Sequence, residues 1–214
     1  MPSQPGRPHP PPSMVPANAR SRRTHAALLA AAHDILKQRG FEALTVTAVA
    51  ERAGVTRRAV YMHFPGRAEL IGAIFDHIAE VEGLAESLGR VWAAPDALAA
   101  LDEWAAHLAR YHPHLLPVDR ALQRVWQADP DAAAHRERVV AEKLGNARRL
   151  ARRLADEGRL APPWTAESAA DMLFALATSD VIEALIVDRG WSPERLARHL
   201  GALFRATFTA PAAS

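Results

Sequence analysis

The sequence predicts an all-α protein with a small N-terminal helix-turn-helix unit, a long connecting helix and a larger helical bundle. From Ser21 onward the apolar residues recur at helical spacing, and Ala and Leu dominate them. No stretch alternates Val, Ile or Thr with polar residues as a half-buried strand would. Gly and Pro separate short helical segments before residue 70 and longer ones after Pro95.

The composition excludes several classes of site. None of the 214 residues is Cys, so the chain has no disulfide, no thiolate metal site and no cysteine nucleophile. No apolar run reaches the length of a membrane span, and no signal peptide is recognisable. We therefore expect a cytoplasmic protein that has no membrane partner. Seven of the first sixteen residues are Pro, which predicts a disordered tail over residues 1–20.

Start and stop signals place the expected helices. Thr45 or Thr47 can cap the second helix and Thr56 the third, with Gly54 in the turn between them. The first helix is expected over residues 22–39, a short second helix through Ala53, and a third from its cap at Thr56 to near His63. A long fourth helix is expected to begin near residue 67 after Pro-Gly. Later helices are expected over residues 96–111, 118–127, 131–158, 165–188 and 192–209.

The third helix carries an unusual set of side chains for its length. When Val60 faces the first two helices, Arg58 and Met62 point almost directly away, with Tyr61 on the flank and Arg57 at the N-terminus. Residues 1–70 hold ten basic and four acidic residues, while the remainder holds 16 basic and 20 acidic. A short helix with a basic outer face, at the basic end of the chain, fits the DNA major groove. A solvated surface with chance clustering of charge is the alternative.

The surrounding stretch, "EALTVTAVAERAGVTRRAVYMHFPGRAEL", and the two residues before it hold several short motifs at the ends of the expected helices. They are Gly40-Phe41 after the first helix, Leu44-Thr45 before the second, Ala50 and Ala53-Gly54-Val55 at the turn, and Tyr61-x-His63-Phe64 at the end of the third. From Thr24 to Phe75 the chain resembles the TetR family of transcriptional repressors. The resemblance implies a helix-turn-helix DNA-binding domain over residues 21–68 and a helical effector-binding and dimerisation domain over residues 69–214.

The resemblance also implies roles for single residues. Thr47, Thr56, Tyr61 and His63 match family positions that contact phosphates, and Arg67 stands where the family usually has a phosphate-binding lysine. Arg57 and Arg58 match the variable positions that read bases. Met62 could make an apolar contact to a thymine methyl group. As alternatives, the two threonines may serve only as N-caps, and Tyr61 and His63 may only cover the side of the motif.

Aromatic residues of the second domain are candidates for an effector cavity. In a family whose second domain usually holds such a cavity, some aromatic residues should line it. Our candidates are Phe75, Trp104, His107, Tyr111 and Trp126, which would suit a small, flat or apolar effector. The alternative is that they belong to the ordinary core.

The last two expected helices have apolar residues in excess. Two terminal helices of this kind predict a four-helix interface in a homodimer. The candidate residues are Leu173, Leu176, Val181, Leu185, Leu196, Leu200, Leu203 and Phe204. As an alternative, these residues close the core of a single chain.

No enzyme or cofactor is expected. His107, His112 and His114 lie close in sequence, but their spacing matches no metal motif and no carboxylate joins them. We expect a repressor that a small effector releases from a palindromic operator. The competing readings are an enzyme or carrier with an incidental helix-turn-helix, an activator, and a regulator that responds to a protein partner.

Overall fold

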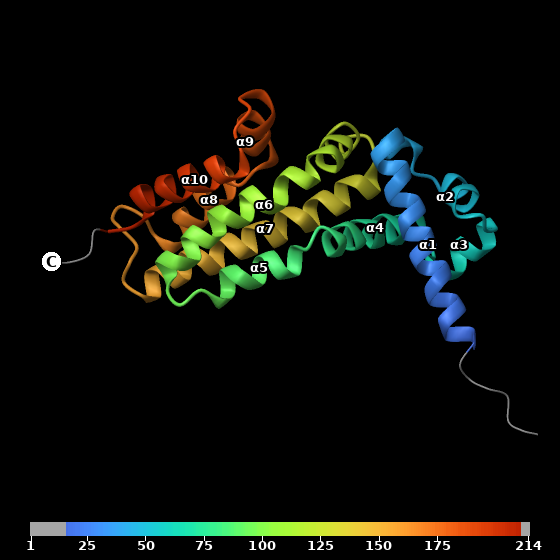
Figure 1. Cartoon of the computed structure of the whole chain (residues 1–214), viewed down its shortest axis with the longest axis horizontal. Coiled ribbons are helices and arrows are strands. Elements are labelled where there is room, and N and C mark those ends of the chain that lie inside the picture. The colour runs from blue at the N-terminus through green and yellow to red at the C-terminus, as the bar shows by residue number, and fades with distance from the viewer. Residues whose placement is uncertain (1–15, 211–214) are drawn as a thin grey trace, which may run out of the picture.

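Helices make up nearly all of the structure, a computed structural model that describes residues 16–210 (Figure 1). Helices α1 to α3 lie at one end, and α4 leads from them into a bundle in which α6 and α7 run side by side. The helices of the N-terminal end are α1 (Pro16–Arg39), the 3-10 turn η1 (Phe41–Ala43), α2 (Val46–Ala53), α3 (Arg57–His63) and α4 (Arg67–Val81). Those of the bundle are α5 (Leu84–Ala93), α6 (Ala97–Gln123), α7 (Pro130–Asp156), α8 (Ala166–Leu176), α9 (Ser179–Glu183), the π-helical turn η2 (Ala184–Asp188) and α10 (Pro193–Phe208). The predicted all-α class is confirmed.

The first helix begins earlier than the sequence predicts. Helix α1 starts at Pro16 rather than near Arg22, so the predicted disorder is wrong for residues 16–20. Pro at a first helical position costs no hydrogen bond, and Ala17 and Ala19 are good helix formers. The rest of the predicted Pro-rich tail lies outside the described residues.

Helix α6 crosses two prolines that we expected to end it. The sequence predicts separate helices over residues 96–111 and 118–127, but α6 continues through Pro113 and Pro117. Each proline lacks the N–H that would bond the carbonyl four residues back. Packing outweighs this cost, because His112 and Leu116 between the prolines are both buried.

Two other helix boundaries differ from prediction. Gly83, with φ of 74°, separates α4 from α5, which the sequence analysis did not distinguish. The helix predicted over residues 165–188 is instead divided at Ala177 and Thr178 into α8, α9 and the turn η2. Its apolar pattern is continuous across the break, so spacing alone did not reveal it. Thr165 and Ser192 cap α8 and α10, since each side chain accepts a backbone hydrogen bond.

Buried residues form two clusters. One lies at the N-terminal end and holds core residues of α1 to α4. It also includes Val118, Ala121 and Leu122 of α6, Val125 from the connection that follows, and Ala132 of α7. The other holds residues of α5 to α10, with Phe204 and Phe208 among its largest buried side chains. The N-terminal helices therefore share their core with the near ends of α6 and α7. Over residues 16–210, no helix is both long enough and apolar enough to cross a bilayer.

Candidate nucleic-acid interface and ligand cavity

Capping and turn residues fix the orientation of α3. The Thr45 hydroxyl accepts from the Ala48 N–H at 3.1 Å, and the Thr56 hydroxyl accepts from the Ala59 N–H at 3.2 Å. Gly54 takes the left-handed conformation (φ 67°) between α2 and α3. Val60 is fully buried against the N-terminal core. The order of capped helix, glycine turn and capped helix gives the helix-turn-helix arrangement that the sequence predicts.

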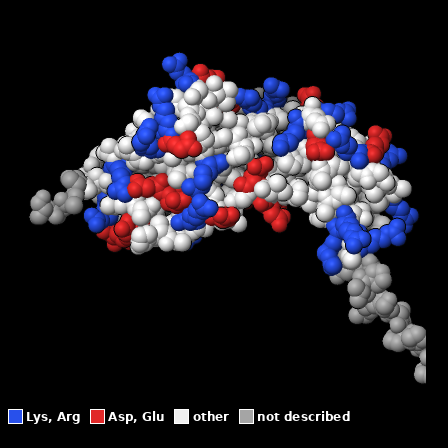
Figure 2. All heavy atoms as spheres, viewed as in Figure 1, with Lys and Arg blue, Asp and Glu red and all other residues white. Residues whose placement is uncertain are grey.

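The outer face of α3 is formed by Arg57, Arg58, Tyr61 and Met62. All four side chains are exposed, and Met62 is 78% exposed, an unusual fraction for a large apolar residue. Within residues 16–210, neither arginine of this face forms an ion pair or a side-chain hydrogen bond. Figure 2 shows basic side chains gathered at this end of the molecule. The face is free to contact a polyanion.

The remaining predicted contacts divide into accessible and covered side chains. Thr47 on α2 and Thr56 are exposed beside the outer face of α3. His63 is half-buried, with its ring 5.5 Å from that of His25 on α1. Burial, and secondarily the neighbouring His63, lowers the pKa of His25 below its usual value. His63 therefore packs beside α1 at the flank of the helix-turn-helix, next to the outer face of α3.

The Arg67 side chain is half-buried and contacts the start of α7 rather than extending toward the outer face of α3. Its guanidinium contacts Asp129 Oδ2 at 2.8 Å and Asp131 Oδ2 at 3.0 Å, at the start of α7. Asp129 is also the N-cap of α7, because its Oδ1 accepts from the Ala132 N–H. The hydrogen bond from Arg67 is the main reason that the pKa of Asp129 lies below its usual value. Two carboxylates already neutralise Arg67 in this structure, so a contact to DNA phosphates, which stays a prediction, would require it to leave them. We call these three residues the α4–α7 ion-pair cluster.

A cavity of about 430 Å³ lies between the two cores. Four of the five predicted residues line it, namely Phe75, Trp104, His107 and Tyr111. Trp126 does not, since its ring lies 4.4 Å below the Arg136 guanidinium. Apolar walls come from α4 to α8, from Ile78, Ala79, Leu84, Leu88, Leu115, Val118, Leu122, Val139, Phe174 and Ala177.

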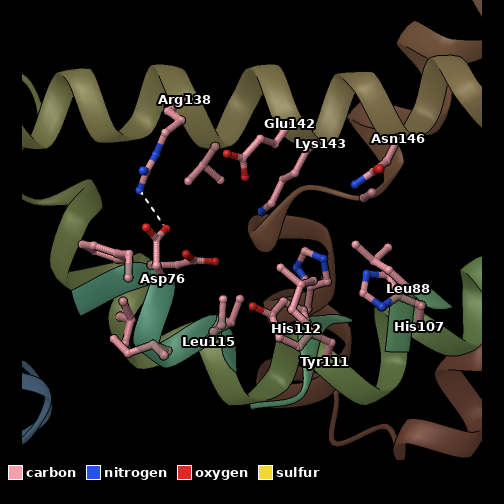
Figure 3. A pocket seen from close by; sticks show the side chains of 18 of the residues that line it. Asp76, Leu88, His107, Tyr111, His112, Leu115, Arg138, Glu142, Lys143 and Asn146 are labelled. Carbon is pink, nitrogen blue, oxygen red and sulfur yellow. Dashed lines mark ion pairs between the residues drawn. The ribbon is translucent and has the colours of Figure 1, made fainter. Parts of the chain in front are cut away.

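Polar side chains of α6 gather on one side of this cavity (Figure 3). The ring of His107 is stacked 5.5 Å from that of Tyr111, and its Nδ1 is 2.9 Å from the Ser87 hydroxyl. Burial lowers the pKa of His107 to about 4 and that of His112 well below its usual value, with Arg110 and Lys143 respectively as the next causes. Both rings are neutral at pH 7. Burial likewise raises the pKa of Tyr111.

The polar face of α7 completes the cavity and was missed by sequence reasoning. Arg138, Glu142, Lys143 and Asn146 project from α7 toward the cavity, with Arg138 paired to Asp76 of α4 at 3.3 Å (Figure 3). Positions 135, 138, 142 and 146 share one helical face, which was the available signal. In residues 16–210, no cluster of His, Asp and Glu has the makings of a metal site.

The predicted dimer residues do not form one exposed surface. Leu173, Leu196, Leu200 and Phe204 are buried in the core of the chain, so this part of the prediction is wrong. Leu176, Val181 and Leu185 are half-buried. Only Leu203, at 44%, is well exposed, together with Met172, at 40%, which was not predicted. The apolar spacing was read correctly as helical, but it could not tell an inner face from an outer one.

Comparisons with known proteins agree with this geometry. The family model described as "Bacterial regulatory proteins, tetR family" matches residues 28–74. The uncharacterised regulator YdeS of Bacillus subtilis is 42% identical over 52 residues, 24% of this chain and 26% of its own length. The repressor BepR of Brucella suis is 27% identical over 193 residues, covering 81% of this chain and 86% of that protein. The structure of a SmeT–triclosan complex superposes with a TM-score of 0.69 at 20% identity, covering 89% of this chain and 93% of that one.

These matches are to bacterial regulators with an N-terminal helix-turn-helix, and residues 28–74 of this chain match the TetR family model. The resemblance predicted from the sequence is confirmed. The match to YdeS spans about a quarter of that relative, so it concerns the N-terminal domain alone. The similar proteins are regulators rather than enzymes, which agrees with the expectation from the sequence.

Proposed function

We propose that the protein is a homodimeric repressor that binds a near-palindromic operator through α3 and releases it when a small molecule enters the cavity. The observation that carries the proposal is the outer face of α3, where two arginines that have no ion-pair partner within residues 16–210 project from a helix fixed at both ends. This arrangement suits insertion into the major groove. We place its action in the cytoplasm.

Within this proposal the exposed residues divide by chemistry. Arg57 and Arg58 would hydrogen-bond base edges, since guanidinium groups pair well with guanine. Thr47, Thr56 and Tyr61 would donate hydroxyl hydrogen bonds to phosphates, and His63 would support them from the side of the motif. Met62 would contact a thymine methyl group. The helix-turn-helix of residues 21–68 would form the DNA-binding domain, and residues 69–214 the regulatory domain.

The dimer would use the outer faces of α8 and α10. Met172 and Leu203 are exposed there, and the small side chains of Ala175, Ala202 and Ala206 are exposed on the same helices. Small residues allow two helices from each subunit to approach closely in a four-helix arrangement. Light scattering at micromolar concentration should report twice the chain mass, and Leu203→Glu should shift it toward one. A monomeric parent protein would contradict this arrangement.

Release by an effector would act through α4. This helix begins at the α4–α7 ion-pair cluster, separated from the end of α3 by three residues, and contributes Phe75 and Ile78 to the cavity wall. A ligand that favours another position of α4 would therefore move α3, to an extent set by its difference in affinity for the two states. SmeT, which shares this fold, was solved with triclosan. A small and mainly apolar effector suits the cavity here.

A selection of bound DNA fragments tests the proposal without knowledge of the operator. Purified protein is incubated with fragmented genomic DNA at low salt, and the enriched fragments are sequenced. We expect a shared near-palindrome whose half-sites are separated by about one helical turn of 34–36 Å. Affinity should fall steeply with salt, because phosphate contacts dominate it. Recovery of fragments without a common sequence would contradict specific binding.

A further inference from the structure

The polar groups of the cavity are unevenly distributed. His107 and His112 of α6 and Lys143 of α7 lie on one side (Figure 3), and the Trp104 ring lies 5.2 Å from that of His107. We call these four side chains the donor end. The Asp76–Arg138 pair lies on the other side, where the two charges neutralise each other (Figure 3). This distribution bears on the chemistry of a bound molecule.

Two ring nitrogens at the donor end are buried without a hydrogen-bond partner in the described structure. They are Trp104 Nε1 and His112 Nδ1, on side chains that are each only 3% exposed. An unsatisfied buried donor costs about 1–3 kcal/mol, so such atoms mark places where a partner belongs. Both residues line the cavity. The indole N–H can only donate, and therefore its missing partner must be an acceptor.

His107 adds a further donor to the indole N–H, and His112 donates from Nδ1 only in the tautomer that carries its hydrogen on that nitrogen. The Ser87 hydroxyl accepts from Arg110 at 3.2 Å and lies 2.9 Å from His107 Nδ1. If the hydroxyl hydrogen is to have an acceptor among the described groups, it must be donated to Nδ1. The neutral ring then carries its own hydrogen on Nε2, the nitrogen that Ser87 does not contact.

Lys143 supplies positive charge to the same end. Burial is the main cause of the lowered pKa of His107 and of His112, and the Lys143 ammonium is a lesser cause for both rings. No carboxylate of residues 16–210 forms an ion pair with it. Its neighbour Glu142 also lines the cavity but is more exposed, so solvent screens that charge more effectively. An anionic group at the donor end would therefore meet an ammonium and ring N–H donors together.

We propose that the effector of this cavity is a flat aromatic molecule with one terminal anionic oxygen group, a carboxylate or a phenolate, held by Trp104, His112 and Lys143. The ring system would lie among the apolar walls beside the stacked His107 and Tyr111 rings. A volume of about 430 Å³ accommodates a molecule of two or three rings. This inference rests on the proposed function for its biological meaning, but the binding itself does not require DNA.

Three matched probes test the inference by isothermal titration calorimetry of the full chain: 2-naphthoate, 2-naphthamide and 2-naphthylmethylammonium. They share the two-ring body and differ in the terminal group. We expect naphthoate to bind at least about tenfold more tightly than the ammonium compound, with the amide between them. Equal affinities, a preference for the cation, or no binding of any probe up to millimolar concentration would overturn the proposal.

Two variants locate the anionic group. Lys143→Met should weaken naphthoate about tenfold and leave the ammonium probe unchanged or tighter. Lys37→Met is the matched control, since Lys37 on α1 is the other lysine of the chain, and it should change neither affinity. Trp104→Phe keeps an aromatic ring but removes the N–H, and should weaken naphthoate and naphthamide alike. Equal effects of the two lysine variants would contradict the proposed site.

Calorimetry also separates this inference from the proposed function. If naphthoate is preferred but the fragment selection recovers no common sequence, the ligand chemistry stands and the repressor role fails. If an operator is found but the probes bind without preference, the repressor role stands and the ligand class is wrong.

Discussion

Two arginines nine residues apart, Arg58 and Arg67, have opposite surroundings. Arg58 is exposed on the outer face of α3 and has no ion-pair partner within residues 16–210, whereas Arg67 contacts two carboxylates at the start of α7. Both look alike in the sequence, as basic residues at the edge of a helix-turn-helix. The carboxylates of Arg67 come from positions 62 and 64 residues later. Availability to a polyanion is therefore decided by the fold rather than by residue type.

The first test of this comparison, with the largest expected effect, is Arg58→Ala. Loss of a bidentate contact to one base should weaken operator binding by about 1–3 kcal/mol and relax specificity at that base. The free energy of unfolding should change by less than about 0.5 kcal/mol, because the side chain is exposed and forms no ion pair or side-chain hydrogen bond with the described residues. Fluorescence anisotropy and urea titration measure the two quantities. Arg152→Ala, an exposed change on α7, is the control, and an equal loss of affinity there would refute the assignment.

The second test reverses the pattern with Arg67→Ala. The substitution leaves Asp129 and Asp131 without their cation and should lower the free energy of unfolding by about 1 kcal/mol, a modest value because all three side chains are partly exposed. The slope of log K against log salt for operator binding should stay unchanged. A phosphate contact would instead reduce that slope by about 1. A reduced slope would show that Arg67 leaves its carboxylates when DNA binds.

The third and smallest effect is a dependence on pH. Because Arg67 lowers the pKa of folded Asp129, its contribution to stability is complete above the unfolded value of about 3.9 and is lost as pH falls through the lower folded value. The difference in melting temperature between parent and Arg67→Ala should stay constant from pH 7 to pH 5 and shrink below about pH 4. A difference that grows on acidification would contradict the sign of this linkage.

Local signals in the sequence were sufficient for the helix-turn-helix. Thr45, Gly54 and Thr56 act within a few residues of themselves, through caps and a left-handed turn, so their roles could be predicted. The cavity was predicted in part, since Phe75, Trp104, His107 and Tyr111 do line it. The roles of these residues in binding remain predictions.

Features that depend on distant partners could not be predicted. The engagement of Arg67 depends on Asp129 and Asp131, and the position of Trp126 depends on Arg136 of the following helix. The continuity of α6 depends on burial from several sides, which outweighs the local penalty of Pro113 and Pro117. In each of these cases tertiary packing overrides a local preference.

The shared N-terminal core limits how this protein can be recombined with its relatives. A chimera that exchanges only residues 21–68 would set a foreign helix-turn-helix against Val118, Leu122 and Ala132, which pack in that core from α6 and α7. The residues that pack together at this end of the molecule are therefore not contiguous in the sequence. A domain exchange that preserves stability therefore has to include α4 and the segment from Val118 to Ala132. A chimera designed to recognise a new operator would then also contain part of the bundle that lines the cavity.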